Sequence, residues 1–205
     1  MKITFDNFSK SYGETRVFEN FCHVFESGTI TAVMGASGSG KTTLLNAVAG
    51  LIDYEGVITV NEDSVSAHGV SYVFQEPRLI PQKTVFANLD FALVSVFSDK
   101  AERKQKIEAM LKEVGLSDAI RKYPHELSGG MAQRVALARA FLYPADILLM
   151  DEPFKGLDKE LKDTIISTFL ELWKKDKRTT LFVTHDENEA NQITENKINI
   201  NQNNN

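Results

Sequence analysis

GASGSGKT, residues 35–42, matches in full the glycine-rich pattern of a phosphate-binding loop. An apolar, β-rich run, TITAVMG (residues 29–35), leads into it, and KTTLLNAVAG (residues 41–50) follows with apolar residues at helical spacing. This order of strand, loop and helix distinguishes a phosphate loop from a tight turn that is merely rich in small residues. We therefore expect the backbone N–H groups of the loop and the N-terminus of the helix to bind a phosphate.

Side chains of this loop have separate expected roles. Lys41 is expected to reach the outer phosphates, and the hydroxyl of Thr42 to ligate Mg²⁺. Thr43 could bind an inner phosphate or simply fill the first helical turn. The residues predicted to bind phosphate are Gly35, Ala36, Ser37, Gly38, Ser39, Gly40, Lys41 and Thr42, with Thr43 as a further candidate.

A second group of candidate residues follows the apolar run in ADILLMDEP, residues 145–153. Parallel sheets bind ligands at the carboxyl ends of their strands, which is where this run delivers two carboxylates. Asp151 is expected to hold the Mg²⁺ through water, and Glu152 to orient and deprotonate an attacking water. The pair could instead begin a helix before Pro153, but the phosphate loop upstream argues against that interpretation.

Three more candidates are single residues. His185 follows the apolar run TTLFVT, so it is expected at the same sheet edge, where it could contact a γ-phosphate; a lone histidine is more often structural. Gln75 follows VSYVF and offers an amide oxygen to the metal or the water. Tyr12, in KSYGE, could stack on an adenine base or lie in a surface turn.

The whole chain of 205 residues is expected to form one α/β domain. The alternating runs KITFDNF and TRVFENFCHVFESG predict a small antiparallel β lobe. Residues of about 77–143 have a helical pattern, seen in AERKQKIEAMLKEVGL, and predict an inserted helical subdomain. Strands and helices alternate elsewhere, so the core is predicted to be a P-loop NTPase fold with a mainly parallel sheet.

Composition narrows the class of protein. The net charge of −5 argues against a nucleic-acid binder that works by broad electrostatic attraction. Cys22 is the only cysteine, which excludes an internal disulfide and a cysteine metal cluster, and we expect it to be a small core residue. No segment is apolar enough to span a bilayer or to serve as a signal peptide, so the expected location is cytoplasmic.

LSGGMAQR, residues 127–134, places two glycines at the start of a stretch that otherwise favours a helix. Together with the phosphate loop, Gln75 and His185, it resembles the ATPase subunit of ABC transporters from Tyr12 to about Ile200. FQEPRLIPQKTVFANL and DEPFKGLD look most like the nitrate, sulfonate and taurine importer group. Two departures are Lys155-Gly156, where small residues are usual, and the short stretch between Gly50 and Gln75, which predicts a trimmed antiparallel lobe.

The resemblance implies ATP hydrolysis with Mg²⁺ between two copies that face each other head to tail. Glu152 is then the general base, His185 a switch histidine and Lys41 a stabiliser of charge. The signature residues of one copy would close on the γ-phosphate held by the other, and an aspartate would couple the two sites. These residues are Ser128, Gly129, Gly130 and Asp158. A helix N-cap formed by Ser128 is compatible with that role.

The implied partners are a second ATPase subunit, transmembrane permease subunits and an extracytoplasmic solute-binding protein, and not nucleic acid. The chain would lie on the inner face of the membrane through the permease, which residues 75–85 are candidates to contact, although those residues could also be an ordinary loop. Importer function is the leading interpretation. An exporter or mechanotransmitting subunit shares every motif, whereas a chromosome-maintenance ATPase would need long arms, and a binding module without turnover is disfavoured because no catalytic position is visibly lost.

Overall fold

Residues 1–64 and 69–201 are described by a computed structural model, in which they form two compact units. The first unit comprises the described residues of 1–72, 145–152 and 176–205, and the second comprises 73–144 and 153–175. Residues 65–68, part of the stretch that predicts a trimmed lobe, lie outside the described residues.

A four-stranded antiparallel sheet forms the N-terminal part of the first unit. Its strands lie in the order β2 (Thr15–Phe25), β1 (Ile3–Tyr12), β4 (Glu55–Val60) and β5 (Asp63–Ser64). The pairs β1/β2, β1/β4 and β4/β5 are antiparallel, as the alternating sequence predicted.

The expectation that Cys22 is a core residue is wrong. In β2 the side chains of Phe21 and Phe25 are buried, whereas Cys22 is exposed. Successive side chains of a strand point to opposite faces, so Cys22, one position from Phe21, falls on the outer face. The alternation of side chains along β2 therefore decides the exposure of Cys22, although cysteine generally prefers the interior.

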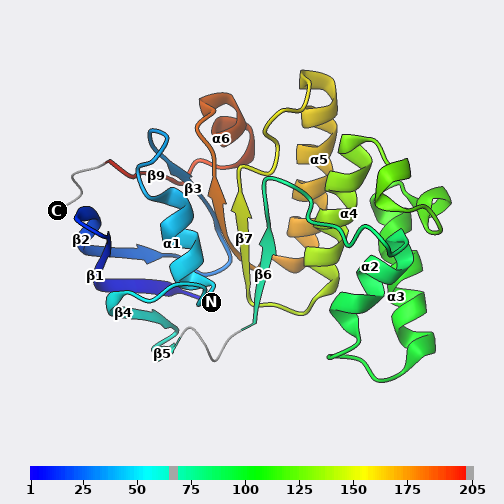
Figure 1. Ribbon diagram of the computed structural model, residues 1–205, viewed down its shortest axis with the longest axis horizontal. Coiled ribbons are helices and arrows are strands. Elements are labelled where there is room, and N and C mark those ends of the chain that lie inside the picture. Colours follow the sequence, from blue (N-terminus) through cyan, green and yellow to red (C-terminus); the bar gives the residue numbers. More distant parts are fainter. Residues whose placement is uncertain (65–68, 202–205) are drawn as a thin grey trace. The chain divides into compact units, whose positions relative to one another are not determined.

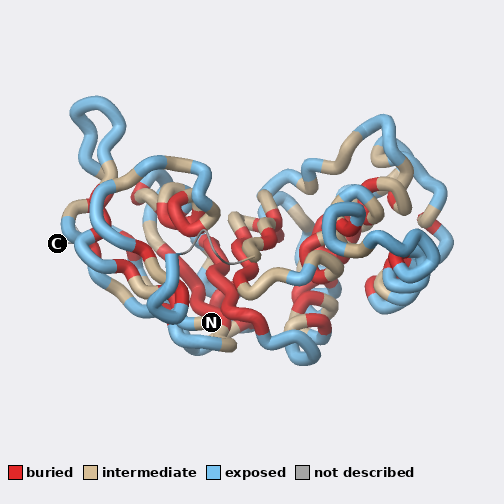
Figure 2. The backbone as a smooth tube through the Cα atoms, turned by 90° about the horizontal axis from the view of Figure 1, so that it is seen from below, coloured by how far each residue is buried: buried red, intermediate tan, exposed pale blue. Residues whose placement is uncertain are grey.

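The second sheet of the first unit is the parallel core. Its five strands lie in the order β6 (Val70–Val73), β7 (Ile147–Asp151), β8 (Thr179–Val183), β3 (Ile30–Met34) and β9 (Lys197–Asn199). The pairs β7/β8, β3/β8 and β3/β9 are parallel, and the arrows of β6 and β7 point the same way in Figure 1. Every residue of β3 and β8 is buried, and Figure 2 draws such buried backbone in red. Burial on both faces explains why these strands are continuous apolar runs.

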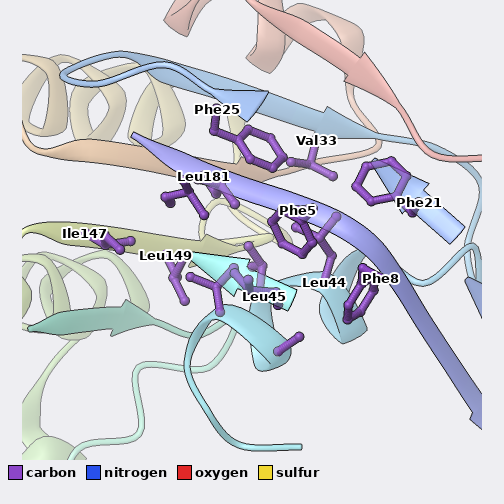
Figure 3. Close-up of a cluster of buried hydrophobic side chains, with 14 of the residues drawn as sticks. Phe5, Phe8, Phe21, Phe25, Val33, Leu44, Leu45, Ile147, Leu149 and Leu181 are labelled. Carbon is purple, nitrogen blue, oxygen red and sulfur yellow. The ribbon is translucent and has the colours of Figure 1, made fainter. Parts of the chain in front are cut away.

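Helix α1 (Lys41–Val48) joins the two sheets of this unit into one hydrophobic core. In Figure 3, Phe5 and Phe8 of β1 lie close to Leu44 and Leu45 of α1. The same cluster includes Ile147, Leu149 and Leu181 from the parallel sheet. The helix that follows the phosphate loop is therefore fixed to the core by its apolar face. A short helix, α6 (Glu187–Ile193), follows β8.

The last strand supports the beginning of the phosphate loop. The Ile200 N–H donates a hydrogen bond to the Met34 carbonyl at 2.7 Å, and the Ile200 carbonyl oxygen lies 2.2 Å from the position that a Cβ atom would take at Gly35. A side chain at position 35 would therefore collide with the backbone of the residue that follows β9.

The second unit is helical. Its main helices are α2 (Val85–Leu93), α3 (Lys100–Glu113), α4 (Gly129–Leu142) and α5 (Lys159–Asp176), with short 3₁₀ turns at Ser117–Ala119 and Pro124–Glu126. The first three helices contact one another, and α4 packs on α5 through the rings of Phe141 and Phe169, whose centroids are 6.2 Å apart. The side chains of Thr84, Asp99 and Ser128 cap α2, α3 and α4. Within the described residues, none of the helices has the length and apolar character that crossing a membrane requires.

Candidate functional site

The phosphate loop has the shape that its glycines permit. Gly40 is the N-cap of α1 with a φ of 100°, a left-handed conformation that L-residues rarely adopt. A Cβ atom at Gly40 would lie 2.5 Å from a methyl of Val17 and 2.7 Å from the ring of Phe18, both in β2. No side chain caps α1, so its first N–H groups are available for an anion.

Lys41 is folded back onto this loop. Its side chain is buried, and its Nζ donates hydrogen bonds to the carbonyl oxygens of Gly35 at 2.9 Å and Ala36 at 2.7 Å. The hydroxyl of Ser39 is also buried, and no hydrogen-bond partner for it exists among the residues that the structure describes. Such an unmatched polar atom inside a loop is what a bound phosphate would satisfy.

Asp151 lies at the carboxyl end of β7, close to the start of α1. Burial raises the pKa of its carboxyl above the ordinary value, whereas a hydrogen bond with Thr42 lowers that pKa. The charge of Glu152 raises the pKa further, and the charge of Lys41 and a hydrogen bond with Tyr72 lower it. The carboxyl of Asp151 and the hydroxyl of Thr42, the two predicted metal ligands of this unit, are thus brought together.

Glu152 and His185 also meet in the first unit. His185 Nδ1 lies 3.2 Å from Glu152 Oε1, although 33 positions separate the two residues in sequence. Glu152 has a φ of 45°, which is unusual for a residue other than glycine, and its N–H bonds the Val183 carbonyl at 3.0 Å. Strained backbone of this kind is concentrated at functional sites.

The first unit holds two more of the predicted nucleotide-binding residues. Tyr12, at the end of β1, is 50% exposed, and the Nζ of Lys10 lies 5.1 Å from its ring centroid. Thr43 is partly buried on the first turn of α1. The ring of Tyr12 is therefore accessible, with the Lys10 ammonium beside it, and Thr43 lies at the start of the helix next to the phosphate loop.

The remaining predicted site residues lie in the second unit. Gln75 is exposed and follows β6. The hydroxyl of Ser128 is exposed and accepts a hydrogen bond from the Met131 N–H at 3.3 Å. The carboxylate of Asp158 is exposed and accepts one from the Leu161 N–H at 3.0 Å, at the start of α5. The expected N-cap role of Ser128 is thus observed.

The two signature glycines differ in what the chain itself requires of them. A Cβ atom at Gly130 would lie 2.5 Å from a methyl of Leu161, so α5 restricts that position. A Cβ atom at Gly129 would have nothing within 4 Å, and its φ is not positive. Packing within the second unit therefore accounts for Gly130 but not for Gly129.

Sequence reasoning missed Tyr72. Its hydroxyl lies 3.4 Å from Asn46 Oδ1 on α1 and is hydrogen bonded to Asp151. The neighbours Ser71 and Val73 are buried, so Tyr72 points to the other face of β6. The alternation in VSYVF could have indicated this orientation, but the strand order that brings β6 next to β7 is not visible in the sequence.

A metal ion would need ligands from outside the protein. Among the described residues, no group of three or more histidine, cysteine, aspartate or glutamate side chains is arranged to hold one. Thr42 and Asp151 offer two oxygen ligands beside the phosphate loop. That set fits Mg²⁺, which commonly combines one or two protein oxygens with the phosphates of a nucleotide.

The chain is similar to known proteins over most of its length. A family model described as ABC transporter matches residues 18–155. The chain is 37% identical to the tungstate uptake system ATP-binding protein TupC of Peptoclostridium acidaminophilum, over 97% of this chain and 94% of that protein. It is 41% identical to the aliphatic sulfonates import ATP-binding protein SsuB of Bacillus subtilis, over 85% of this chain and 68% of that protein.

Solved structures show the same fold. The dimeric structure of MJ0796, a bacterial ABC transporter cassette, is 30% identical and superposes with a TM-score of 0.85, covering 98% of this chain and 94% of that one. The cbiO1 structure from Clostridium perfringens, at 23% identity, has a TM-score of 0.88 over 98% of this chain and 84% of its own. The α/β fold predicted from the phosphate loop is thereby confirmed. The chain belongs to the ABC transporter family, as one of its ATP-binding ATPase subunits.

Proposed function

We propose that the chain hydrolyses ATP with Mg²⁺ between two copies of itself or of a close homologue, and thereby drives solute import through a membrane permease. One observation supports the chemistry most directly. The ends of three neighbouring strands in the first unit bring together the phosphate loop, Asp151 and the pair of Glu152 and His185. Such convergence at the carboxyl edge of a parallel sheet is typical of nucleotide sites.

The phosphate loop supplies binding. Backbone N–H groups of residues 35–41 and the N-terminus of α1 surround the phosphates, and Tyr12 stacks on the base. Lys41 exchanges its bonds to the Gly35 and Ala36 carbonyls for bonds to phosphate oxygens. The buried hydroxyl of Ser39 gains an acceptor in the same step.

Thr42 and Asp151 would hold the magnesium ion, with Gln75 as a further ligand for the ion or its water. Bound Mg²⁺ neutralises charge on the transferred phosphoryl group. The hydrogen bond between Thr42 and Asp151 keeps both side chains at the place where the ion is needed.

Glu152 acts as the general base. Its carboxylate accepts a proton from water as the oxygen of that water bonds to the γ-phosphorus and the bond to the β-phosphate oxygen breaks. His185 Nδ1–H donates to Glu152 Oε1 and orients the carboxylate, and the imidazolium form, in which Nε2–H is a second donor, would bond an oxygen of the γ-phosphate. The short separation of 3.2 Å supports this pairing of roles.

The signature segment completes the site of a second copy. Gly129 has no packing reason to be glycine, which supports a close approach by a ligand from outside the chain. Ser128 and the N-terminus of α4 then bind the γ-phosphate of the partner, and Asp158 contributes to the coupling of the two sites. Shifting such an association from 1:99 to 99:1 needs about 5.5 kcal/mol of differential binding.

Import is the favoured direction because relatives such as SsuB are named as import proteins. The permease would contact the inserted helical region at about 77–143 and residues 75–85, and a solute-binding protein would deliver the solute outside the cell. Phe91 and Val94, on and just after α2, are 61% and 56% exposed, which supports an apolar contact here. The chain would thus be peripheral on the cytoplasmic face.

Glu152→Gln tests the enzyme function. We expect turnover to be lost while ATP and Mg²⁺ still bind, so that size-exclusion chromatography detects a stable dimer with ATP. Glu187→Gln, at an exposed carboxylate on α6, is the matched control and should turn over at the wild-type rate. Absence of hydrolysis by wild type together with its permease would contradict the proposed function.

A further inference from the structure

Arg139, near the end of α4, binds the segment that carries Gln75. Its guanidinium donates to the Pro77 carbonyl at 2.8 Å and to the Arg78 carbonyl at 2.9 Å. More than sixty positions separate these residues along the chain, and all of them belong to the second unit. The planar fork of arginine suits a pair of neighbouring acceptors, which a lysine ammonium cannot match with two fixed donors.

The charge of Arg139 has no carboxylate partner among the described residues, and the two carbonyls are its hydrogen-bond acceptors. Burial lowers the pKa of Arg139 from its ordinary value, but an arginine stays charged in a protein. A partly buried cation held only by carbonyl dipoles is poorly explained as an ion pair. The hydrogen bonds of Arg139 instead fix the backbone conformation of residues 77 and 78.

Other contacts hold the same segment. Arg78 has a φ of 44°, and its guanidinium lies 3.8 Å from the ring centroid of Phe74. Farther along, Asn88 accepts a bond from the Ile80 N–H at 2.7 Å and donates to the Ile80 carbonyl at 3.2 Å. Gln75 is exposed between Phe74 and the two carbonyls that Arg139 holds. The backbone around Gln75 is therefore fixed while its side chain projects to solvent.

We propose that Arg139 is a positioning residue, which fastens the Gln75 segment to α4 so that Gln75 and the signature segment move as one piece. The inference rests on the proposed function, in which both groups act on bound ATP. Ser128 caps one end of α4, and Arg139 lies eleven residues further along, roughly 16 Å at 1.5 Å per residue. When a partner's nucleotide draws the start of α4 towards it, the bonds of Arg139 carry Gln75 with the helix.

The test compares variants of the full chain, assembled with its permease, in steady-state ATPase assays. Arg139→Gln should lower kcat on the order of tenfold with KM for ATP within about twofold, because a misplacement of about 1 Å at a reacting group can cost up to about a hundredfold in rate. The phosphate loop, which governs ATP affinity, is unchanged. Arg139→Lys keeps the charge and one donor, so it should fall between wild type and Arg139→Gln.

Arg103→Gln is the matched control. Arg103 is a buried arginine of α3 that also binds two consecutive carbonyls, those of Phe97 at 2.8 Å and Ser98 at 3.1 Å. It belongs to the same unit, and it also pairs with Asp90 at 2.6 Å, but its hydrogen bonds to described residues all lie outside the Gln75 segment. Both variants should lower the melting temperature, whereas the loss of kcat per folded molecule should be confined to Arg139→Gln.

A double-mutant cycle separates positioning from general damage. If Arg139 acts through Gln75, combining Arg139→Gln with Gln75→Ala should lower kcat no further than Gln75→Ala alone. Hydrogen exchange of residues 74–80 should accelerate in Arg139→Gln and Arg139→Lys but not in Arg103→Gln. If Arg139→Gln does not fold, the hydrogen exchange of residues 74–80 in Arg139→Lys alone tests whether Arg139 holds this segment.

Unchanged exchange at 74–80, multiplicative losses in the double variant, or equal kcat losses in Arg103→Gln and Arg139→Gln would overturn the positioning role. Failure of the proposed function has a different signature: wild type would not hydrolyse ATP, or Gln75→Ala would turn over like wild type. Suppose that residues 74–80 exchange faster in Arg139→Gln but Gln75→Ala has the wild-type kcat. Arg139 then holds the segment as inferred, and it is the proposed role of Gln75 in ATP hydrolysis that is wrong.

Discussion

Single residues around Asp151 determine how firmly this carboxylate, a ligand of the proposed Mg²⁺ site, is held. Tyr72→Phe removes only the hydroxyl that bonds Asp151 and leaves the ring in place. We expect the Mg²⁺ concentration for half-maximal ATPase activity to rise on the order of tenfold, because a hydrogen bond to a charged group contributes about 1.5 kcal/mol. Binding of Mn²⁺ with ADP, followed by electron paramagnetic resonance, should weaken by a similar factor.

Tyr54→Phe controls for loss of a tyrosine hydroxyl in the same unit. Tyr54 packs on Phe8, and its hydroxyl is not among the groups that hydrogen bond Asp151. Its variant should keep the wild-type metal requirement. Equal Mg²⁺ dependence of Tyr72→Phe and Tyr54→Phe would show that the Tyr72 hydroxyl does not position Asp151.

Most chemistry-bearing residues of the first unit could be predicted from the sequence, because their type and local spacing carry the signal. Lys41, Asp151 and His185 each follow a strand-like run within a few residues. Tyr72 and Arg139 could not be predicted in this way. Their roles come from bonds to residues 79 and 61 positions away, and local spacing contains no information on such pairings.

Among the helices, α4 begins with a glycine, Gly129, which lowers the stability of the helix but serves the proposed function. Gly129→Ala should raise the free energy of unfolding of the second unit by up to about 1 kcal/mol, because alanine favours a helix and the added methyl enters open space. ATP-dependent dimerisation and ATPase activity should nevertheless fall, since the methyl would face the partner's nucleotide. Urea unfolding and size-exclusion chromatography measure the two effects.

Gly130→Ala is the paired substitution on the same helix. Its methyl would lie 2.5 Å from a methyl of Leu161, so the gain in helix propensity is offset by displacement of that side chain. We expect no stabilisation from it. A Gly129→Ala protein with full activity would mean that position 129 has no contact outside the chain.

Strand β2 gives the antiparallel sheet a dependence on pH. Burial lowers the pKa of His23, which packs against the ring of Phe25 at a centroid distance of 4.6 Å. The folded state therefore binds the proton less readily than the unfolded state, so stability falls as the pH drops through the ordinary value of about 6.5 towards the lowered pKa. His23→Gln should show a smaller loss of melting temperature between about pH 7.5 and pH 5.5. An identical loss in both proteins would assign the pH dependence to other groups.

The positions of strands and helices were easier to predict from the sequence than which of their side chains face the core. Continuous apolar runs indicated β3, β7 and β8, and helical spacing indicated α1 and α3. The burial of Cys22 was predicted wrongly because the register of β2 decides which alternate side chains face the core. Register depends on the pairing of β2 with β1, a long-range contact.

In the proposed function, each of the two units of the whole molecule holds one half of a nucleotide site, and another copy of the chain completes each half. Lys41→Ala impairs one half-site and Ser128→Arg the other, so each variant alone should be inactive. An equimolar mixture should recover up to about a quarter of wild-type activity, because half of the head-to-tail dimers are mixed and each holds one intact site. ATPase assays of the mixture after exchange of subunits, with the permease present, measure this recovery. A mixture as inactive as its components would exclude sharing of sites between chains.

The contact between Ile200 and Gly35 makes the residue that follows β9 a support of the proposed nucleotide pocket. Truncation after Asn196 would remove β9. The edge of β3 would then be unpaired, and Gly35 would lose the support of the Ile200 backbone. Such a shortened protein should lose affinity for ATP while keeping every residue of the glycine-rich motif. An affinity tag joined directly after Ile200 would therefore need a flexible spacer, so that its bulk does not displace the strand that shapes the pocket.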